Sequence, residues 1–421
     1  MRQPQSDKGV TWEELFFDLA FVFAVTQITA ELFADHDWLG VAQGLILFIS
    51  MYWAWVGVTI YANQRDIGNV RDRVVIFTLG FGNLVLALAI PGAFDDRGLL
   101  YGVSYVIIRV LLAGFALNNF REWRGFFVGP YGVGALISGP LLLIGGIVDG
   151  DARIVLWATA SAIDIFSPLV LRRQLAKFRV RPVHYTHRYG LLLILVLGES
   201  VVQVGAVASS LPLTWPRMIA VAGSYALASG LWWAYFIHGL WAFRRAVVQS
   251  EGHGDVRRSI LLYAHLGFSC GIIAISVGQA EVVRSPLSGM RMGDAALLYA
   301  GSALFLGTFA YTHWRLHRTV AWRRLLAATA CLVFFPVATL IPALAALVTL
   351  AGVIIVVNVV EQAILRRHGA GRFSGIGPYR PDGAEAEVKA EIDSDSGAEG
   401  GVRIGPGREV DTTDNGPIVS D

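Results

Sequence analysis

Apolar runs of about twenty residues recur along this chain and constrain its fold more than any other feature. A helix needs about 20 mostly apolar residues to cross the hydrocarbon core of a bilayer, and in lipid a helix satisfies all of its own backbone hydrogen bonds. Charged residues make up only 16% of the chain and hydrophobic residues 55%, whereas average globular proteins carry about 25% charged residues. The sequence therefore predicts an all-α integral membrane protein.

Hydropathy predicts about twelve transmembrane helices. No cleavable signal is expected, because Glu13 and Glu14 rather than a basic region precede the first apolar run. The last apolar stretch is too long for one crossing and contains Pro342, so we expect a helical hairpin that turns at Ile341-Pro342. The predicted spans are 14–34, 38–62, 74–94, 98–118, 125–148, 154–171, 189–210, 217–240, 259–280, 294–312, 324–341 and 343–364.

The distribution of basic residues predicts the orientation of the chain. If the N-terminus is inside, 21 Lys and Arg residues fall in segments predicted to be cytoplasmic before the tail, and five fall in the opposite loops. Basic loops face the cytoplasm. Both termini are therefore expected to be cytoplasmic, which agrees with an even number of spans.

The predicted organisation has five parts. After residue 365 the chain becomes polar, and from Pro381 onward it holds eleven acidic and three basic residues, so this segment is expected to be disordered. The acidic tail either lies against the basic cytoplasmic loops or is a solvated extension. The parts are a cytoplasmic N-terminus (1–13), a first six-helix half (14–171), a basic cytoplasmic loop (172–188), a second six-helix half (189–365) and the tail (366–421).

Three ordered matches suggest an internal repeat. Trp53-Ala54 in span two aligns with Trp233-Ala234 in span eight, and "GNVR" from Gly68 aligns with "GDVR" from Gly254. The ends of spans four and ten, "GFALNNFREWR" and "TFAYTHWRLHR", also align. These matches predict two parallel six-helix halves, an arrangement found in some secondary transporters, whose sites lie between the halves.

Polar side chains inside the predicted spans are the candidate functional residues. A charge at the bilayer centre costs about 2.5–3.5 kcal/mol on insertion scales, so such residues face a cavity or a partner. Glu199 has the weakest structural explanation, because it lies near the middle of span seven beside Gly198 and Ser200. The candidates for an ion or substrate pathway are Asp18, Glu199, Gln203, Arg109, Asp164, His265 and Gln279.

Several of these residues have structural alternatives. Glu13 and Glu14 lie in the first turn of a helix, where carboxylates offset the helix dipole. Asp18 is either functional or paired with one of four arginines near the same end of the spans. Arg109 is a possible counter-ion of Asp164 or of Glu199, and His265 is either a packing residue or a proton relay. The four arginines are Arg65, Arg71, Arg73 and Arg188.

Signatures of enzymes and cofactor sites are absent from the sequence. There is no phosphate-binding glycine loop, zinc-helix motif or nucleophile elbow, and the two cysteines, Cys270 and Cys331, fall inside apolar spans. His184 and His187 lack a carboxylate or cysteine companion in their loop. We therefore expect no catalytic residue, metal or cofactor, and no nucleic-acid partner.

Four sequence blocks resemble conserved blocks of the bacterial low temperature requirement A protein family. They are "ELFFDLAFVFAVTQ" from Glu14, "HRYGLLLILVLGESVV" from His187, "LWWAYF" from Leu231 and "YAHLGFSCGIIAISVG" from Tyr263. The resemblance covers roughly residues 11–365 and implies a multi-pass protein of the bacterial inner membrane, without naming a reaction. The motif positions it implies are Glu14, Phe17, Asp18, Gln27, Gly198, Glu199, Ser200 and Trp233.

Three functional hypotheses follow. The first is a proton- or ion-coupled secondary transporter of a small solute, in which Asp18 and Glu199 face a common interior and bind the coupling ion. The second is a non-transporting membrane factor that binds lipid or partner proteins and supports growth in the cold. The third, a membrane-embedded enzyme acting on lipid, is least favoured because no catalytic constellation is found.

Overall fold

The computed structural model describes residues 9–34, 37–65, 67–116, 131–175, 180–249 and 254–367. The described residues form helices joined by turns, three of them with π-helical segments. The helices are α1 (Trp12–Ala34), α2 (Trp38–Gln64), α3 (Val70–Leu88), α4 (Gly98–Ala116), η2 (Gly134–Ser138), α6 (Gly139–Ile147), α7 (Asp151–Val170), α8 (Arg172–Leu175), α9 (Pro182–Ser209), α10 (Trp215–Trp233), η3 (Ala234–Gly239), α11 (Leu240–Gln249), α12 (Gly254–Arg257), η4 (Arg258–Tyr263), α13 (Ala264–Arg284), α14 (Met292–His317), α15 (Trp322–Ala338) and α16 (Ala343–Arg367).

Local sequence signals set several helix ends. Asp37 and Asn69 cap α2 and α3, because their side chains accept hydrogen bonds from the backbone N–H groups of the first turn. Helix α3 ends at Leu88, earlier than the predicted 94, since proline at 91 cannot continue a helix and Gly92 adopts a φ of +88°. The predicted hairpin near Pro342 is confirmed, because α15 ends before it and α16 begins directly after it.

Eight of the described helices are long and apolar enough to cross a bilayer by length and composition. Each coincides with a predicted span, whereas α3, α10 and α15 fall below this criterion. The span predicted at 125–148 begins outside the described residues, and its described part is a shorter apolar helix, Gly134–Ile147. The eight helices are Trp12–Ala34, Trp38–Gln64, Gly98–Phe115, Asp151–Val170, Pro182–Ser209, Gly254–Arg284, Met292–His317 and Ala343–Ile364.

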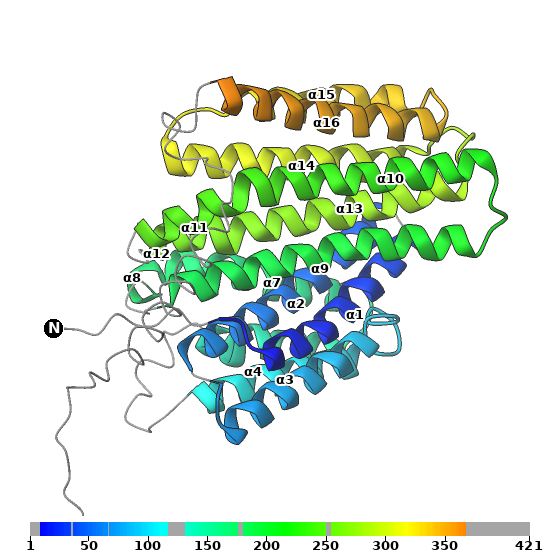
Figure 1. Cartoon of the computed structure of the whole chain (residues 1–421). Helices are drawn as coiled ribbons and strands as arrows, with labels where there is room; N and C mark the ends of the chain where they lie inside the picture. Colours follow the sequence, from blue (N-terminus) through cyan, green and yellow to red (C-terminus); the bar gives the residue numbers. More distant parts are fainter. Residues whose placement is uncertain are drawn as a thin grey trace, which may run out of the picture. The chain divides into compact units, whose positions relative to one another are not determined.

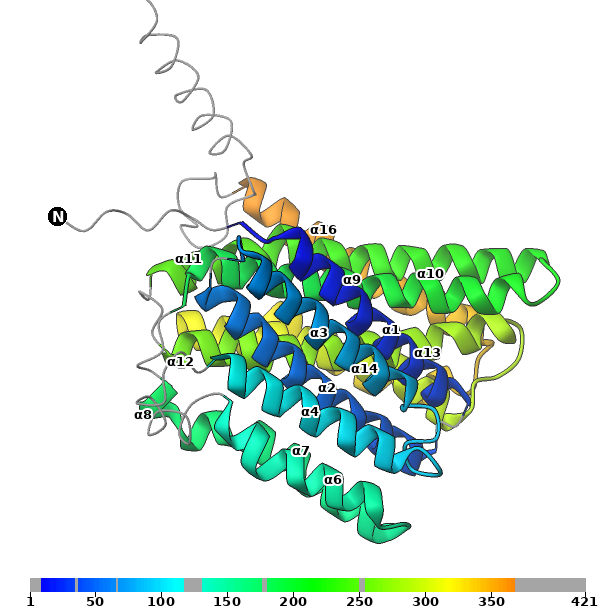
Figure 2. The ribbon, with the colours of Figure 1, turned by 90° about the horizontal axis from the view of Figure 1, so that it is seen from below.

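The helices run side by side and fall into two groups with the same order of packing (Figure 1). We call α1, α2, α3, α4, α6 and α7 the N-terminal group, and α9, α10, α13, α14, α15 and α16 the C-terminal group. In each group the first helix contacts the second and third, the third contacts the fourth, the fourth contacts the fifth, and the sixth contacts the fifth and second. Figure 2 shows this succession from α3 through α4 to α6 and α7.

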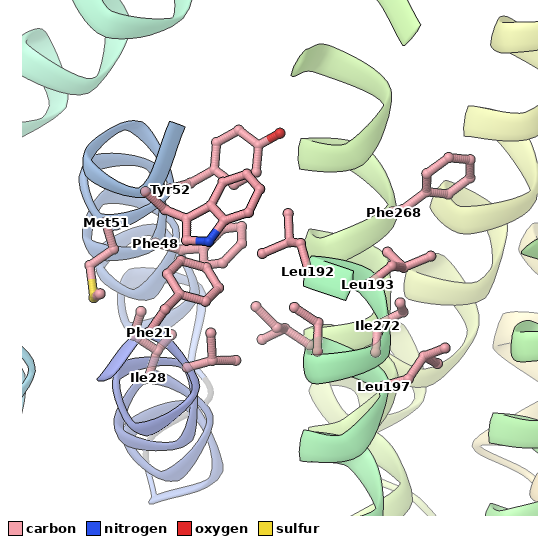
Figure 3. Close-up of a cluster of buried hydrophobic side chains, with 14 of the residues drawn as sticks. Phe21, Ile28, Phe48, Met51, Tyr52, Leu192, Leu193, Leu197, Phe268 and Ile272 are labelled. Atoms are coloured by element: carbon pink, nitrogen blue, oxygen red, sulfur yellow. The ribbon is translucent and has the colours of Figure 1, made fainter. Parts of the chain in front are cut away.

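The two groups meet through α1 and α2 on one side and α9 and α13 on the other. A continuous apolar core fills this junction, and Figure 3 shows Leu192 of α9 pointing toward Phe21 and Tyr52 of the N-terminal group, with Leu193 on the other side of α9. All four side chains are buried. Among the polar residues predicted from the sequence, those on α1, α9 and α13 belong to helices that form this junction, whereas Arg109 and Asp164 lie on α4 and α7.

Candidate functional site

Asp18 on α1 forms a fully buried ion pair with Arg188 on α9. Two hydrogen bonds join them, from Nη1 to Oδ2 at 2.5 Å and from Nη2 to Oδ1 at 2.8 Å. The indole Nε1 of Trp55 on α2 donates a third hydrogen bond to Oδ1, at 2.9 Å. Of the four arginines that the sequence offered to Asp18, Arg188 is its partner. Both carboxylate oxygens are therefore occupied, and Asp18 ties three helices together.

Glu14, one turn earlier on α1, extends this network. It forms a reciprocal capping box with Thr11, because each residue's backbone N–H donates to the other's side chain at 3.4 Å. The same carboxylate lies 3.0 Å from His184 Nε2 and 3.4 Å from Arg188 Nε. Glu14 is 1% exposed, so it does more than offset the helix dipole. Glu13, by contrast, pairs with the half-exposed Arg73 at 2.8 Å.

The hydrogen bonds of Asn63 indicate which ring nitrogen of His184 carries the proton. The Asn63 Oδ1 accepts from the backbone N–H of Arg181, which leaves Nδ2 as the donor to His184 Nδ1 at 3.0 Å. Since Nδ1 then accepts, Nε2 carries a proton and donates to Glu14. His184 thus joins α2, α9 and α1. Helix α9 begins seven residues before the predicted span because the polar side chains of its first turns are satisfied by α1 and α2.

Glu199 lies at the next level of the same two helices and has a different environment. The hydroxyl of Thr26 on α1 lies 2.5 Å from Glu199 Oε2 and also 3.2 Å from the carbonyl oxygen of Val22. In the described part of the chain, Glu199 Oε1 has no hydrogen-bond partner although the residue is 1% exposed. No cation among the described residues pairs with Glu199, so it is buried without a counter-ion.

Arg109 on α4 and Asp164 on α7 form a second polar site within the N-terminal group. The guanidinium lies 4.0 Å from Asp164, and its Nη1 donates to the carbonyl of Trp53 at 3.0 Å. The two Asp164 oxygens accept shorter hydrogen bonds from Ser138 at 2.7 Å and Tyr105 at 2.8 Å. Of the two counter-ions considered for Arg109, Asp164 is therefore the one that lies nearby.

The remaining predicted pathway residues are buried, and two of them, His265 and Gln279, donate or accept hydrogen bonds within the helix core. His265 donates from Nδ1 to the carbonyl of Ile260 at 2.9 Å and accepts at Nε2 from the Tyr235 hydroxyl at 2.6 Å. Both ring nitrogens are occupied, which favours the packing interpretation. Gln279 donates to the carbonyl of Ser224 on α10 at 3.1 Å. Gln203 lies one turn beyond Glu199 and is 8% exposed.

The motif positions do not form a single site. Phe17 and Ser200 are buried, Gln27 is partly buried, and Trp233 is 43% exposed on the outer face of α10. Added atoms at Gly198 would meet nothing within 4 Å. Only Glu14, Asp18 and Glu199 of this set carry the polar contacts between α1 and α9.

Two of the cavities among the described residues are bordered by charged side chains. The first, of about 90 Å³, is bordered by α2, α4, α7, the start of α9 and the α12–η4 segment, and it includes Arg109, Arg257 and Arg258. The second, of about 290 Å³, lies among η3, α11, α14, α15 and α16, beside the Arg324–Glu361 ion pair. Among the residues that the structure describes, no group of three or more His, Cys, Asp and Glu side chains is arranged to hold a metal ion.

Sequence reasoning missed several partners in these sites. Thr26, Trp55 and Tyr105 are neutral residues in apolar helices. Burying them in a membrane does not carry the cost of burying a charge, so the sequence does not mark them as candidates. His184 did carry a usable signal: Glu14 and Asp18 are four residues apart on one helix, and His184 and Arg188 are four residues apart on another. Residues at this spacing share a helix face, so the two complementary pairs could have been matched.

The geometry defines a multi-pass membrane protein of all-α architecture, because eight apolar helices of bilayer length enclose ion-paired side chains in their shared core. The sequence matches the family model of the bacterial low temperature requirement A protein over residues 9–359. The chain therefore belongs to this family.

Comparison with individual proteins adds one relative of undescribed function. The chain is 28% identical over 385 residues to "Uncharacterized protein RA0937" of Rhizobium meliloti (strain 1021), and the match covers 87% of this chain and 92% of the relative. No solved structure matches the chain.

Proposed function

We propose that this protein is a proton-coupled secondary transporter of a small solute, in which Glu199 carries the coupling proton. The observation that carries the proposal is the shared hydroxyl of Thr26. This hydroxyl has one hydrogen but faces two acceptors, Glu199 Oε2 and the carbonyl of Val22. A hydroxyl donates only one hydrogen bond, so the protonation state of Glu199 decides which of the two acceptors receives the hydrogen bond from Thr26.

Two hydrogen-bond arrangements follow from this competition. When Glu199 is protonated, its own O–H donates to Thr26, and Thr26 then donates to Val22. When Glu199 is ionised, Thr26 turns to the carboxylate, and Val22 loses its side-chain donor. Each proton gained or lost on α9 therefore rearranges a contact within α1, which gives the junction between the two helix groups a proton-dependent element.

The repeated packing order supports an architecture of two parallel halves. Two contacts join α1 to α9, Asp18–Arg188 and Thr26–Glu199. Residue numbers rise on both helices from the first contact to the second, so α1 and α9 run in the same direction, as expected for equivalent first helices. Each of the two cavities is also bordered by the fourth and sixth helices of one group, α4 and α7 in the first and α14 and α16 in the second. We propose twelve crossings in the bacterial inner membrane, with both termini cytoplasmic as the basic loops indicate, and alternating access by movement of one half against the other.

A flux experiment tests the proposal. Purified protein is reconstituted into liposomes that contain a pH-sensitive dye, and a mixture of amino acids, sugars and organic anions is added outside. We expect proton movement with wild type, its loss in Glu199→Gln, and wild-type rates in Glu31→Gln, which removes an exposed carboxylate from α1. Growth complementation in the cold is measured for the same variants.

The outcomes separate transport from structure. Full flux or full complementation by Glu199→Gln would remove the proposed role of this residue. Loss of folding in Glu199→Gln, measured by thermal unfolding in detergent, would show that the carboxylate is structural instead. Thr26→Val should retain folding and slow proton movement, because the hydroxyl that donates to the ionised Glu199 is removed.

The second candidate is a non-transporting membrane factor that binds lipid or partner proteins. Its specific support is the completeness of the Asp18 and His265 contacts, in which every side-chain polar atom has a partner and the polar residues join helices. Absence of proton movement with every solute, together with normal complementation by Glu199→Gln, would favour this candidate. We propose no enzymatic reaction for the chain.

A further inference from the structure

The cavity bordered by Arg109, Arg257 and Arg258 has an unusual distribution of charge. These three arginines come from three different elements, α4, α12 and η4, and no Asp or Glu is among the described residues that border the cavity. Its volume of about 90 Å³ is well below the 300–1,000 Å³ typical of drug-sized ligands. The space therefore suits one small anionic group.

Arg109 is held in place at the inner wall of this cavity. A Cβ added to Gly134 would lie 1.7 Å from Arg109 Nη2 and 1.9 Å from Nε, so the absence of a side chain at Gly134 leaves the space that the guanidinium fills. The Nη1 group is anchored by the Trp53 carbonyl, and Tyr105 lies 5.6 Å from the guanidinium carbon. This arrangement fixes the orientation of a side chain that is only 3% exposed.

The charge of Arg109 is only partly compensated. Asp164 lies at 4.0 Å and directs its oxygens to Ser138 and Tyr105, while Arg109 Nε has no hydrogen-bond partner within the described ranges. A buried charged donor that lacks a partner is costly. Arg109 borders the cavity, so an anion there would place a second negative charge beside the guanidinium.

The α12 and η4 segments supply further hydrogen-bond donors to the border of the cavity. Arg257 donates to the carbonyl of Leu175 at 3.2 Å, which holds the α12 segment against α8. Arg258 pairs with the exposed Asp255, and its buried Nε is unsatisfied in the part of the chain that the structure describes. Trp53 and Tyr185 also border the cavity and add aromatic surface to it.

We propose that this cavity binds a phosphate group, either as free phosphate or as the headgroup of an anionic lipid. Guanidinium groups match phosphate oxygens with paired, charge-assisted hydrogen bonds, and basic pockets between membrane helices bind lipid headgroups. Three arginines around a small volume suit a group with several charged oxygens. This site does not depend on the proton-coupling role of Glu199, which does not border the cavity.

Binding is tested with the purified full-length chain and two probes. Radiolabelled inorganic phosphate is measured by equilibrium dialysis in detergent. Separately, the protein is reconstituted in vesicles of equal parts phosphatidylglycerol and phosphatidylcholine, extracted, and analysed by native mass spectrometry for retained lipid. Saturable phosphate binding without lipid retention identifies the free anion, and preferential retention of phosphatidylglycerol identifies the lipid.

Matched arginine variants locate the site. Arg258→Gln and Arg109→Gln should each weaken binding by about tenfold or more, since each removes a charge-assisted contact. Arg291→Gln, at a largely exposed arginine that pairs with Asp294 and does not border the cavity, should bind as wild type. Thermal unfolding is measured first, and Arg258→Gln decides the result if Arg109→Gln does not fold. Absence of both kinds of binding in wild type, or unchanged binding in Arg258→Gln, would overturn the proposal.

Discussion

Replacing Asp18 with asparagine should destabilise the protein strongly, because it leaves Arg188 buried without its main counter-ion. The two side chains are 1% and 0% exposed and share hydrogen bonds of 2.5 and 2.8 Å. Breaking a buried pair by removing one partner costs about 3–5 kcal/mol. Glu14, 3.4 Å from Arg188 Nε, retains one carboxylate beside the arginine, so we expect Asp18→Asn to fall toward the lower end of this range.

A neighbouring, more exposed pair provides the matched control. The side chains of Arg73 and Glu13 are 49% and 16% exposed, and ion pairs that water reaches contribute about 0–1 kcal/mol. Unfolding of wild type, Asp18→Asn and Glu13→Gln is followed by tryptophan fluorescence during titration with a denaturing detergent. A loss of stability in Asp18→Asn no larger than that in Glu13→Gln would refute the reasoning.

A double-mutant cycle then isolates the pair. The variant Asp18→Asn/Arg188→Gln removes both charges and should recover part of the stability lost in Asp18→Asn, because the guanidinium that lacked its partner is gone as well. Additive losses would mean that the two residues act independently.

Two further predictions concern topology and packing. With native cysteines replaced, a cysteine at Ser250 should react with an impermeant reagent only from the cytoplasm and one at Asp96 only from outside; labelling of both from one side would contradict the orientation. Gly301→Ala should destabilise the protein by about 1–3 kcal/mol through overpacking, since its Cβ would lie 2.9 Å from the Gly271 carbonyl oxygen. Gly307→Ala on the same helix meets nothing within 4 Å and should be neutral or stabilising by up to about 1 kcal/mol; equal effects in detergent unfolding would reject the close α13–α14 packing.

The sequence predicted helix positions well because apolar length and proline are local signals. The breaks near Pro342 and between α1 and α2 follow directly from them. The cost of a charge in lipid is also readable from one residue, and it singled out Asp18, Arg109, Asp164 and Glu199, all of which are buried. The number of crossings is harder to predict, because helices such as α3 and α15 are near the limits of length and hydropathy.

Partner choice could not be predicted to the same depth. The sequence left four arginines open for Asp18, and choosing Arg188 requires the rotation of α9 relative to α1. The proposed phosphate site could not be predicted from the sequence, because Gly134, Arg109 and Arg258 come from separate segments of the chain. A glycine that makes room for a guanidinium has no sequence signature of its own.

The two polar contacts between α1 and α9 have different roles in the proposed mechanism. At one level, Asp18 and Arg188 form a buried ion pair. At the next level, Thr26 faces Glu199 and supplies a hydroxyl but no charge. In the proposed mechanism, the ion pair holds the two helix groups together while Glu199 changes protonation state, because the two contacts lie at different positions along the same pair of helices.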